Sequence, residues 1–487
     1  MVLGVEPAVA ISDAEARFER VRRSVGLWLA APVFGLVWLA AGDGKDGRLA
    51  AIMALAAVLW ISEAIPPAVT ALLAAALTVL IGVATPKEAF GAFGHPLLFL
   101  FIGSFFLAEA MVVHGLGERF ARAAHRVARG RMGSLVALSV ATFALSLFMS
   151  NTAATAVVLP VAVAVARADG HRGFGAALVL AIAYAASVGG IGTPVGTPPN
   201  LIAIERIRDA GIEIGFLRWM ALGLPIGLVM LAVLFALFAR RFDLQGGAAV
   251  RVPGSSGPWS RGELAVATAF STAVLLWVLP GVLELALPGH AFTVWVGARL
   301  DEPVVAVLAA ALLFVWPIGR DADGEPRRAL GWAQAARIDW GTVLLFGGGI
   351  LLGELAGKTG LSAKLGDALV AASGADSLWT LTALITATSI LLSEATSNTA
   401  TATLMLPIAI SIAAAADVPL APPALGAAFG SSFGFTLPIS TAPNAMAYGT
   451  GRVTIRQMAG AGIIFDVIGF LVILAGLRLL CPLLGLV

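Results

Sequence analysis

Long apolar stretches alternate with short polar segments along the whole chain. Residues 27–41, 221–238, 265–283 and 463–480 are examples. Such stretches approach or reach the roughly 20 residues that cross a bilayer as an α-helix. A membrane β-barrel would show short segments of alternating polarity instead. The pattern predicts an all-α polytopic membrane protein, and the composition agrees, because only 12% of the residues are charged against about 25% in soluble domains.

Eleven of the apolar stretches are assigned as full transmembrane spans. They lie near 25–41, 49–62, 66–84, 97–117, 174–205, 216–238, 263–285, 302–318, 341–357, 424–448 and 461–482. Two further apolar stretches remain, at 134–166 and 365–414. Each carries the polar tripeptide Ser-Asn-Thr near its middle, at residues 150–152 and 397–399.

The distribution of basic residues predicts the orientation of the chain. With a cytoplasmic N-terminus and an external C-terminus, the cytoplasmic segments collect 21 of the 31 basic residues, and all lysines lie outside. This positive-inside bias holds only if 134–166 and 365–414 return to the side that they entered from. Residues 134–149 form a helix about 24 Å long, shorter than the roughly 30 Å hydrocarbon core. Both stretches are therefore predicted to be re-entrant hairpins with the tripeptide at the tip.

Segments around the two tripeptides repeat in the same order. Residues 98–109 resemble 343–354, and Pro-Val-Gly-Thr-Pro-Pro-Asn at 194–200 parallels Pro-Ile-Ser-Thr-Ala-Pro-Asn at 438–444. Five crossings separate the hairpins, so the second hairpin is expected to enter from the opposite face. Inverted repeats with broken helices near the midplane are typical of secondary transporters, and the breaks mark the binding site.

The hairpin tips and the breaks favour an anion together with a hard cation. A helix that starts at Asn151 or Asn398 presents unpaired N–H groups and a partial positive charge. The Ser, Asn and Thr side chains can cap that helix or donate to a carboxylate. Glycine and proline in the breaks prevent a continuous helix, and the freed carbonyl oxygens suit a cation such as sodium.

No Lys, Arg or His occurs in 132–166, 173–205 or 365–451. An uncompensated charge inside the membrane is costly. A dianion held by these elements must therefore be neutralised by helix ends and by bound cations, which points to coupled cation entry.

The paired Ser-Asn-Thr tips, together with the Gly-Thr-Pro-Pro-Asn-like breaks, resemble the divalent-anion/sodium symporters, the INDY-type dicarboxylate transporters. The resemblance covers almost the whole chain beyond about residue 25. It implies an elevator mechanism, in which a transport domain slides across the membrane against a dimeric scaffold. The implied scaffold is 25–133 and 263–359, and the implied transport domain is 134–262 and 360–487, after a cytoplasmic N-terminal segment at 1–24.

The resemblance also implies the residues of the site. The residues that contact the substrate carboxylates are Asn151, Thr152, Asn398 and Thr399, and those that line the pocket are Pro198 and Ala442. The ligands of one sodium ion are Ser146, Ser150, Asn151 and a carbonyl at Gly196. The ligands of a second are Ser393, Thr396, Asn398 and a carbonyl near Ser440. At Ala442 the second break has an alanine where the first break has Pro198, the first of two consecutive prolines.

Both tripeptides are intact, which favours C4-dicarboxylates such as succinate, malate or fumarate. We therefore predict a sodium-coupled symporter of the cytoplasmic membrane. The alternatives are a sodium-independent dicarboxylate exchanger and a transporter of citrate or sulfate. An intramembrane hydrolase that uses Ser150 or Ser397 would need a His or Lys base, which these segments lack, and an ion channel would need a continuous water path. No enzymatic activity is expected.

The expected partners are the dicarboxylate, sodium ions, membrane lipids and a second copy of the chain, with no nucleic acid. The single Cys481 excludes a disulfide within the chain and a cysteine-based metal cluster. The residues before Leu27 lack the cleavage site of a signal peptide. Four acidic residues in apolar segments have no assigned role: Glu109, Glu354, Glu394 and Asp466.

Overall fold

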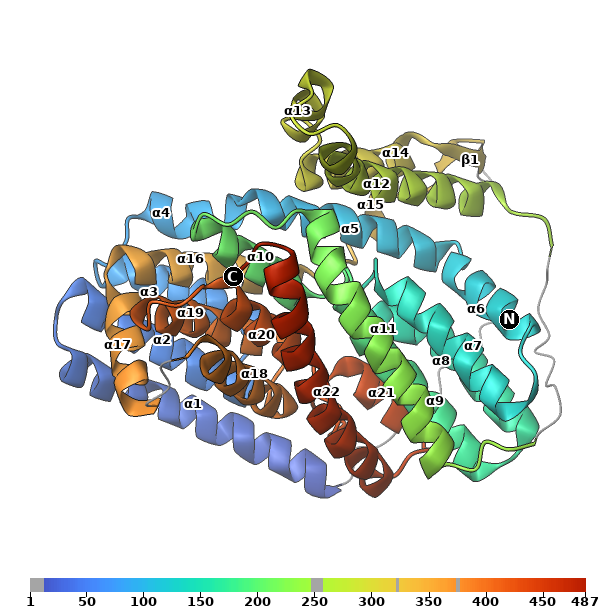
Figure 1. Ribbon diagram of the computed structural model, residues 1–487, viewed down its shortest axis with the longest axis horizontal. Helices are drawn as coiled ribbons and strands as arrows, with labels where there is room; N and C mark the ends of the chain where they lie inside the picture. The colour runs from blue at the N-terminus through green and yellow to red at the C-terminus, as the bar shows by residue number, and fades with distance from the viewer. Residues whose placement is uncertain (1–12, 247–256, 321–323, 374–376) are drawn as a thin grey trace. The chain divides into compact units, whose positions relative to one another are not determined.

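The computed structural model describes residues 13–246, 257–320, 324–373 and 377–487. Helices dominate these residues (Figure 1). The exception among them is a short antiparallel pair of strands, β1 (Pro317–Arg320) and β2 (Pro326–Arg328). Within the described ranges, ten helical segments are long and apolar enough to cross a membrane. The predicted all-α polytopic class is confirmed at this level.

Contacts divide the chain into two units. Unit 1 comprises Met1–Gly94, Leu344–Leu474 and Leu486–Val487, and unit 2 comprises His95–Val343 and Ala475–Gly485. Each unit contains one of the two Ser-Asn-Thr tips and one of the two broken helices.

The helices of unit 1 come from two separate stretches of sequence. They are α1 (Asp13–Ala41), α2 (Lys45–Ser62), α3 (Pro67–Leu80), α4 (Pro86–Gly91), the 3-10 helix η1 (Ala92–Gly94), α17 (Leu361–Ser373), α18 (Leu378–Ala395), α19 (Asn398–Ala415), α20 (Ala421–Ser431) and α21 (Ala442–Gly449). Two longer helices lie mostly in unit 1 and place one end in unit 2: α16 (Trp340–Lys358) and α22 (Ile455–Leu483).

The helices of unit 2 form one continuous run of sequence. They are α5 (Pro96–Val113), α6 (Leu116–Arg126), α7 (Gly130–Ser146), α8 (Asn151–Asp169), α9 (Arg172–Gly190), α10 (Pro198–Asp209), α11 (Phe216–Arg241), α12 (Arg261–Ala286), α13 (Ala291–Gly297), α14 (Glu302–Val315) and α15 (Trp332–Ala335).

Each predicted span overlaps one or two helices, but several boundaries differ. The number of crossings stays a prediction, because the ten apolar segments include α8, α18 and α19 of the predicted hairpins and leave out α2, α3 and α14. The span expected at 97–117 ends at Val113, and the separate helix α6 follows a turn at Gly115. Gly115 adopts a φ of 65°, and Gly360 before α17 adopts a φ of 78°, a left-handed conformation that glycine tolerates best. Helix α1 already begins at Asp13, so part of the predicted N-terminal segment is helical, and residues 1–12 of that segment lie outside the described residues.

The order of elements from α5 to α11 is repeated from α16 to α22. In each copy a long helix is followed by a short helix, a two-helix hairpin, a broken helix and a further long helix. Both arms of the first hairpin, α7 and α8, pack against α9, and both arms of the second, α18 and α19, pack against α20. The hairpins and breaks predicted from the repeated motifs are therefore present in both units. By length alone α8, α18 and α19 could each cross a membrane, so the depth at which the hairpins turn stays a prediction.

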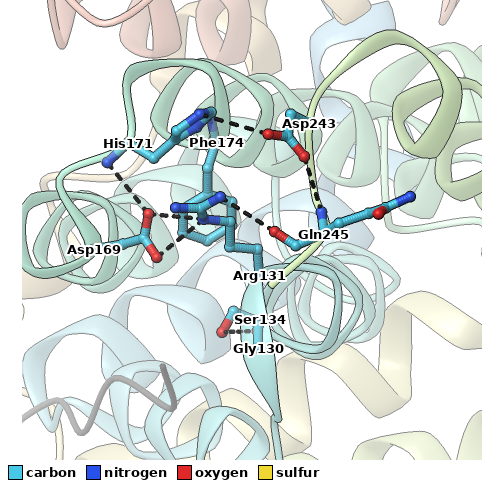
Figure 2. Close-up of polar contacts among 8 residues, drawn as sticks. All are labelled: Gly130, Arg131, Ser134, Asp169, His171, Phe174, Asp243 and Gln245. Atoms are coloured by element: carbon cyan, nitrogen blue, oxygen red, sulfur yellow. Dashed lines mark hydrogen bonds and ion pairs between the residues drawn. The ribbon is translucent and has the colours of Figure 1, made fainter. Parts of the chain in front are cut away.

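An ion pair joins the start of α7 to the end of α8 at the base of the first hairpin. Arg131 Nε lies 2.9 Å from Asp169 Oδ1, and the side chains are 16% and 5% exposed. The Arg131 guanidinium also donates to the carbonyl of Gln245 beyond α11, and Asp169 accepts from the backbone N–H of His171 just before α9 (Figure 2). One end each of α7, α8, α9 and α11 therefore lies in this cluster, and the chain returns through α8 to the level at which α7 began.

The Asp169→Ala variant should lower the stability of the protein, because Arg131 would keep its charge at a largely buried position without its carboxylate. We expect a loss of about 2–3 kcal/mol, somewhat less than for fully buried pairs, because Arg131 keeps the Gln245 carbonyl. Thermal unfolding in detergent measures the change as a lower melting temperature.

The matched control is Asp243→Ala. The Asp243 side chain is 65% exposed and its carboxylate lies 3.9 Å from His171 Nε2, so its removal should change the stability by no more than about 0.5 kcal/mol. An equal loss in both variants would contradict a special role for the ion pair at the hairpin base.

Candidate functional site

Each hairpin turns at its Ser-Asn-Thr tripeptide, and the serine caps the second arm. Ser150 Oγ accepts from the N–H of Ala153 at 3.2 Å at the start of α8. Ser397 Oγ accepts from the N–H of Ala400 at the same distance at the start of α19. The predicted capping role is confirmed at both tips. Further N–H groups in each first turn give the tip a partial positive charge.

Several oxygen atoms converge below the tip of the first hairpin, in unit 2. Ser146 Oγ lies 2.8 Å from Asn151 Oδ1 and 2.7 Å from the carbonyl oxygen of Ala186 on α9. A Cβ atom at Gly196 would lie 2.4 Å from the carbonyl oxygen of Gly190 and 2.8 Å from that of Ser146. The backbone at Gly196 can approach these carbonyls only because glycine has no side chain.

The same arrangement recurs below the tip of the second hairpin, in unit 1. Ser393 Oγ lies 2.9 Å from Asn398 Oδ1 and 2.7 Å from the carbonyl oxygen of Ser431 on α20. A Cβ atom at Gly434 would lie 3.1 Å from the Ser393 carbonyl oxygen and 3.2 Å from the Cβ of Ser440. Ser393, Asn398 and Ser440 therefore gather around Gly434.

The hydroxyl of Thr396 faces a different partner. Its Oγ1 lies 2.7 Å from Thr401 Oγ1 and also donates to the carbonyl of Leu392. The described contacts do not join this hydroxyl to Ser393, so any role as a cation ligand must use another rotamer or the backbone carbonyl.

Both breaks are closed by an asparagine that the motif contains but for which no role was predicted. Asn200 Nδ2 donates to the carbonyls of Gly190 and Thr193 at 2.8 and 2.7 Å. Asn444 Nδ2 donates to the carbonyls of Gly434 and Leu437 at 2.9 and 3.1 Å. The two side chains thus satisfy carbonyls that lost their helical partners. Each Oδ1 is buried and accepts no hydrogen bond from the described residues.

Most of the predicted cation ligands are more deeply buried than the predicted substrate contacts. The predicted cation ligands with side chains at most 9% exposed are Ser146, Asn151, Ser393, Thr396 and Ser440. Of the predicted substrate contacts, Thr152 and Ala442 are exposed, and Asn398, Thr399 and Pro198 are half-buried. In each unit the predicted cation ligands therefore lie largely beneath residues that remain accessible.

The oxygen atoms below each tip fit a small monovalent cation. A serine hydroxyl has one proton, yet Ser146 and Ser393 each contact an amide oxygen and a backbone carbonyl oxygen. A cation bound among these oxygens would relieve their mutual repulsion, and neutral hydroxyl, amide and carbonyl oxygens suit a hard ion of single charge. A reversed amide on Asn151 or Asn398 would satisfy the same contacts by donation.

Two carboxylates lie beside the second break. Glu394 accepts from the N–H of Thr436 at 2.9 Å and from Ser440 Oγ at 2.5 Å. Thr436 Oγ1 donates to Asp466 Oδ2 at 3.0 Å, and the Asp466 side chain also lies within hydrogen-bonding reach of Glu394. Sequence reasoning left both acids without a role. The contact of Glu394 with Ser440 places it directly behind a predicted cation ligand.

An arginine from α1 reaches the second tip, which the sequence pattern does not predict. The Arg22 guanidinium donates to the carbonyl of Ala395 at the end of α18 at 3.1 Å and to Glu63 at 3.0 Å. The hairpins and broken helices themselves carry no cation in their central segments, but this one lies beside Thr396. Because Glu63 compensates its charge, the pair adds no net charge at the tip.

Comparisons with known proteins agree with this architecture. The chain matches the family model described as citrate transporter over residues 57–422 and 292–485. It is 32% identical to the sodium-dependent dicarboxylate transporter SdcS of Staphylococcus saprophyticus, over 96% of this chain and 93% of that protein. It is 33% identical to the protein of the same description from Staphylococcus aureus strain MSSA476, over 88% and 85%.

A solved structure shares the fold. The crystal structure of the YdaH transporter of Alcanivorax borkumensis superimposes with a TM-score of 0.53 and 17% identity, over 85% of this chain and 88% of that chain. The long match to the family model and the coverage of the curated relatives bear out the resemblance drawn from the paired tips. The chain is an integral membrane protein and belongs to the citrate transporter family, within the divalent-anion/sodium symporters.

Proposed function

We propose that the protein is a sodium-coupled symporter of C4-dicarboxylates such as succinate, malate or fumarate. The observation that carries the proposal is the cluster of serine, asparagine and carbonyl oxygens that recurs below both tips. The names of the relatives from Staphylococcus support the same ion and substrate class. Citrate is the alternative substrate, because the family model carries that description.

Sodium binding precedes substrate binding in the proposed mechanism. A sodium ion held by Ser146, Asn151 and neighbouring carbonyls fixes the start of α8, and a second ion fixes the start of α19 through Ser393 and Asn398. Asn151, Thr152, Asn398 and Thr399 then donate to the substrate carboxylates. The bound cations offset the charge of the dianion, so the loaded protein can carry it through the membrane at a lower cost.

The proposed orientation places the N-terminus in the cytoplasm and the C-terminus outside, in the cytoplasmic membrane. Two contacts in unit 2 support it. Arg119, on helix α6 just after the span formed by α5, donates to the carbonyl of Gly257, just before the span formed by α12. The arginine-bearing ends of these spans therefore share one membrane surface. Arg218 at the start of α11 donates to the carbonyl of Leu484, so the chain ends at the level where α11 begins.

The scaffold of 25–133 and 263–359, the mobile transport domain of 134–262 and 360–487 and the homodimer form the rest of the proposal. They derive from the resemblance to the elevator-type transporters of the family.

Sodium should drive uptake of labelled succinate into proteoliposomes. We expect concentrative uptake with an inward sodium gradient and none with potassium or choline, because in the proposed mechanism sodium fixes the tips before the dianion binds. Competition by unlabelled malate, fumarate, citrate and sulfate then ranks the substrates. Equal uptake in all three salts would rule out sodium coupling.

Asn151→Ala and Asn398→Ala should each abolish saturable uptake over the concentration range in which the unmodified protein saturates. A hydrogen bond to a carboxylate contributes about 1.5–3 kcal/mol, or about 10–150-fold in affinity. The control is Thr268→Ala on α12, whose hydroxyl bonds only to the carbonyl of Leu264 on its own helix among the described contacts. Unchanged kinetics in either asparagine variant would remove that residue from the site.

Ser146→Ala and Ser393→Ala should raise the sodium concentration that gives half-maximal uptake by about 10-fold or more, a loss typical of altered metal sites. Ser139 on α7 and Ser389 on α18 supply matched controls, because both are fully buried serines that accept or donate no hydrogen bond among the described residues. Their alanine variants should keep the sodium dependence of the unmodified protein. A shift of the same size in the controls would show that loss of any buried hydroxyl is sufficient.

A further inference from the structure

A cavity of about 400 Å³ lies in unit 2 between α6 and the residues that precede α12. Arginines and apolar side chains line it together: Arg119, Arg122, Arg126, Leu116, Phe120 and Trp259. Neither the tips nor the breaks contribute to this cavity, so the proposed transport mechanism does not account for it.

The charges around the cavity leave one cation in excess. The Arg119 guanidinium donates to Glu263 Oε1 at 3.1 Å and lies 5.3 Å from the centre of the Trp259 ring, so it is held in place. Arg122 pairs with Glu118 one turn earlier on the same helix. Arg126 is exposed and has no ion pair with any described residue.

The histidine on the same helix does not change this balance. His125 lies on the buried face of α6, where its Nε2 is 3.1 Å from Ser134 Oγ. Burial lowers the pKa of His125, so the ring is neutral at physiological pH. The cavity therefore carries a net charge of about one positive unit.

The cavity lies at a membrane surface. Helix α6 starts three residues after the apolar span that ends at Val113, and α12 begins two residues after Trp259. Phe120 and Trp259 are 49% and 51% exposed. Aromatic side chains collect at the level of lipid headgroups, and basic pockets beside transmembrane helices bind anionic headgroups there.

We propose that this cavity binds the headgroup of a phospholipid with a single negative charge, such as phosphatidylglycerol. Arg122 and Arg126 donate to the phosphodiester oxygens, whose geometry matches the planar guanidinium. Arg119 lines the same cavity beside them. An acyl chain lies against Leu116 and Phe120. A free phosphate ion makes no use of this apolar surface, and a headgroup of several charges exceeds the single uncompensated cation.

The test measures lipid retention by native mass spectrometry of the full-length protein. The purified protein is exchanged into micelles with equal amounts of phosphatidylglycerol and phosphatidylcholine. We expect preferential retention of phosphatidylglycerol by the unmodified protein. The double variant Arg122→Gln/Arg126→Gln should lose it by about fivefold or more, since each basic residue near an anionic surface contributes roughly that factor.

Arg129→Gln is the matched control, because Arg129 is exposed on the same arginine-bearing stretch but does not line the cavity. It should retain phosphatidylglycerol like the unmodified protein. Equal loss in the control, or equal retention of the two lipids by the unmodified protein, would overturn the proposal. Displacement of phosphatidylglycerol by inorganic phosphate would overturn it in favour of a phosphate site. Melting temperatures establish that each variant is folded, and the readout does not depend on transport.

Discussion

The breaks in the two apolar helices impose the constraint on which the site depends. A break leaves backbone carbonyls without their helical N–H partners, and a buried carbonyl without a donor is costly. Asn200 and Asn444 supply the donors, each to two carbonyls of its own break. Their amides therefore fix the unwound backbone in one conformation. Gly190 and Gly434 lie at the same breaks, where Gly190 contacts Asn151 and Gly434 contacts Ser393 of the neighbouring hairpin.

In both halves an asparagine side chain donates to the free carbonyls of the break, but the charged groups near the two breaks differ. The second half has Glu394 behind Ser440, Asp466 beyond it and the Arg22–Glu63 pair at the tip. Among the described residues, the matching contacts of the first half involve neutral groups, such as the Thr193 hydroxyl, which donates to the carbonyl of Leu147. Under the proposed function, a cation in the second half is therefore attracted by a nearby carboxylate as well as by neutral oxygens, and the two cation sites are not equivalent in electrostatic terms.

The sequence predicts those features that depend on local patterns. The length of the apolar stretches predicts the helices, and proline and glycine predict the breaks. The serine before each asparagine predicts where the second arm of each hairpin begins. The repeat also relates the two halves, because the same short motifs carry the same local geometry. Helix α6 is missed because it is short and partly polar, and such segments resemble loops when apolar length is the criterion. Most of α17 is merged into the hairpin predicted at 365–414, although the structure makes it a separate helix before α18.

Contacts between distant segments cannot be read from the pattern. The Asn200 and Asn444 side chains are visible in the motif, but their partners depend on how the backbone unwinds. Arg22 is one of the 21 basic residues whose predicted cytoplasmic side orients the chain, yet its guanidinium reaches Ala395, 373 positions away. Long flexible side chains at the ends of spans contribute both to topology and to specific contacts, and only the packing of α1 against its neighbours decides between the two.

The contacts within unit 2 favour motion of the binding elements as one body. Helices α7, α8, α9 and α11 meet at the Arg131–Asp169 pair, and α7 and α9 meet again at the contact of Ser146 with the Ala186 carbonyl. Sliding α7 along α8 would break a largely buried ion pair, at a cost of about 2–3 kcal/mol, somewhat less than for a fully buried pair. Displacing the whole group breaks different contacts, such as the 2.8 Å pair of His95 with Glu205, which joins α5 to α10. The His95 and Glu205 side chains are 22% and 8% exposed, so this pair is nearly as buried as Arg131 and Asp169. The proposed elevator motion therefore requires the ion pair between α5 and α10 to break or to move, while the Arg131–Asp169 pair stays intact.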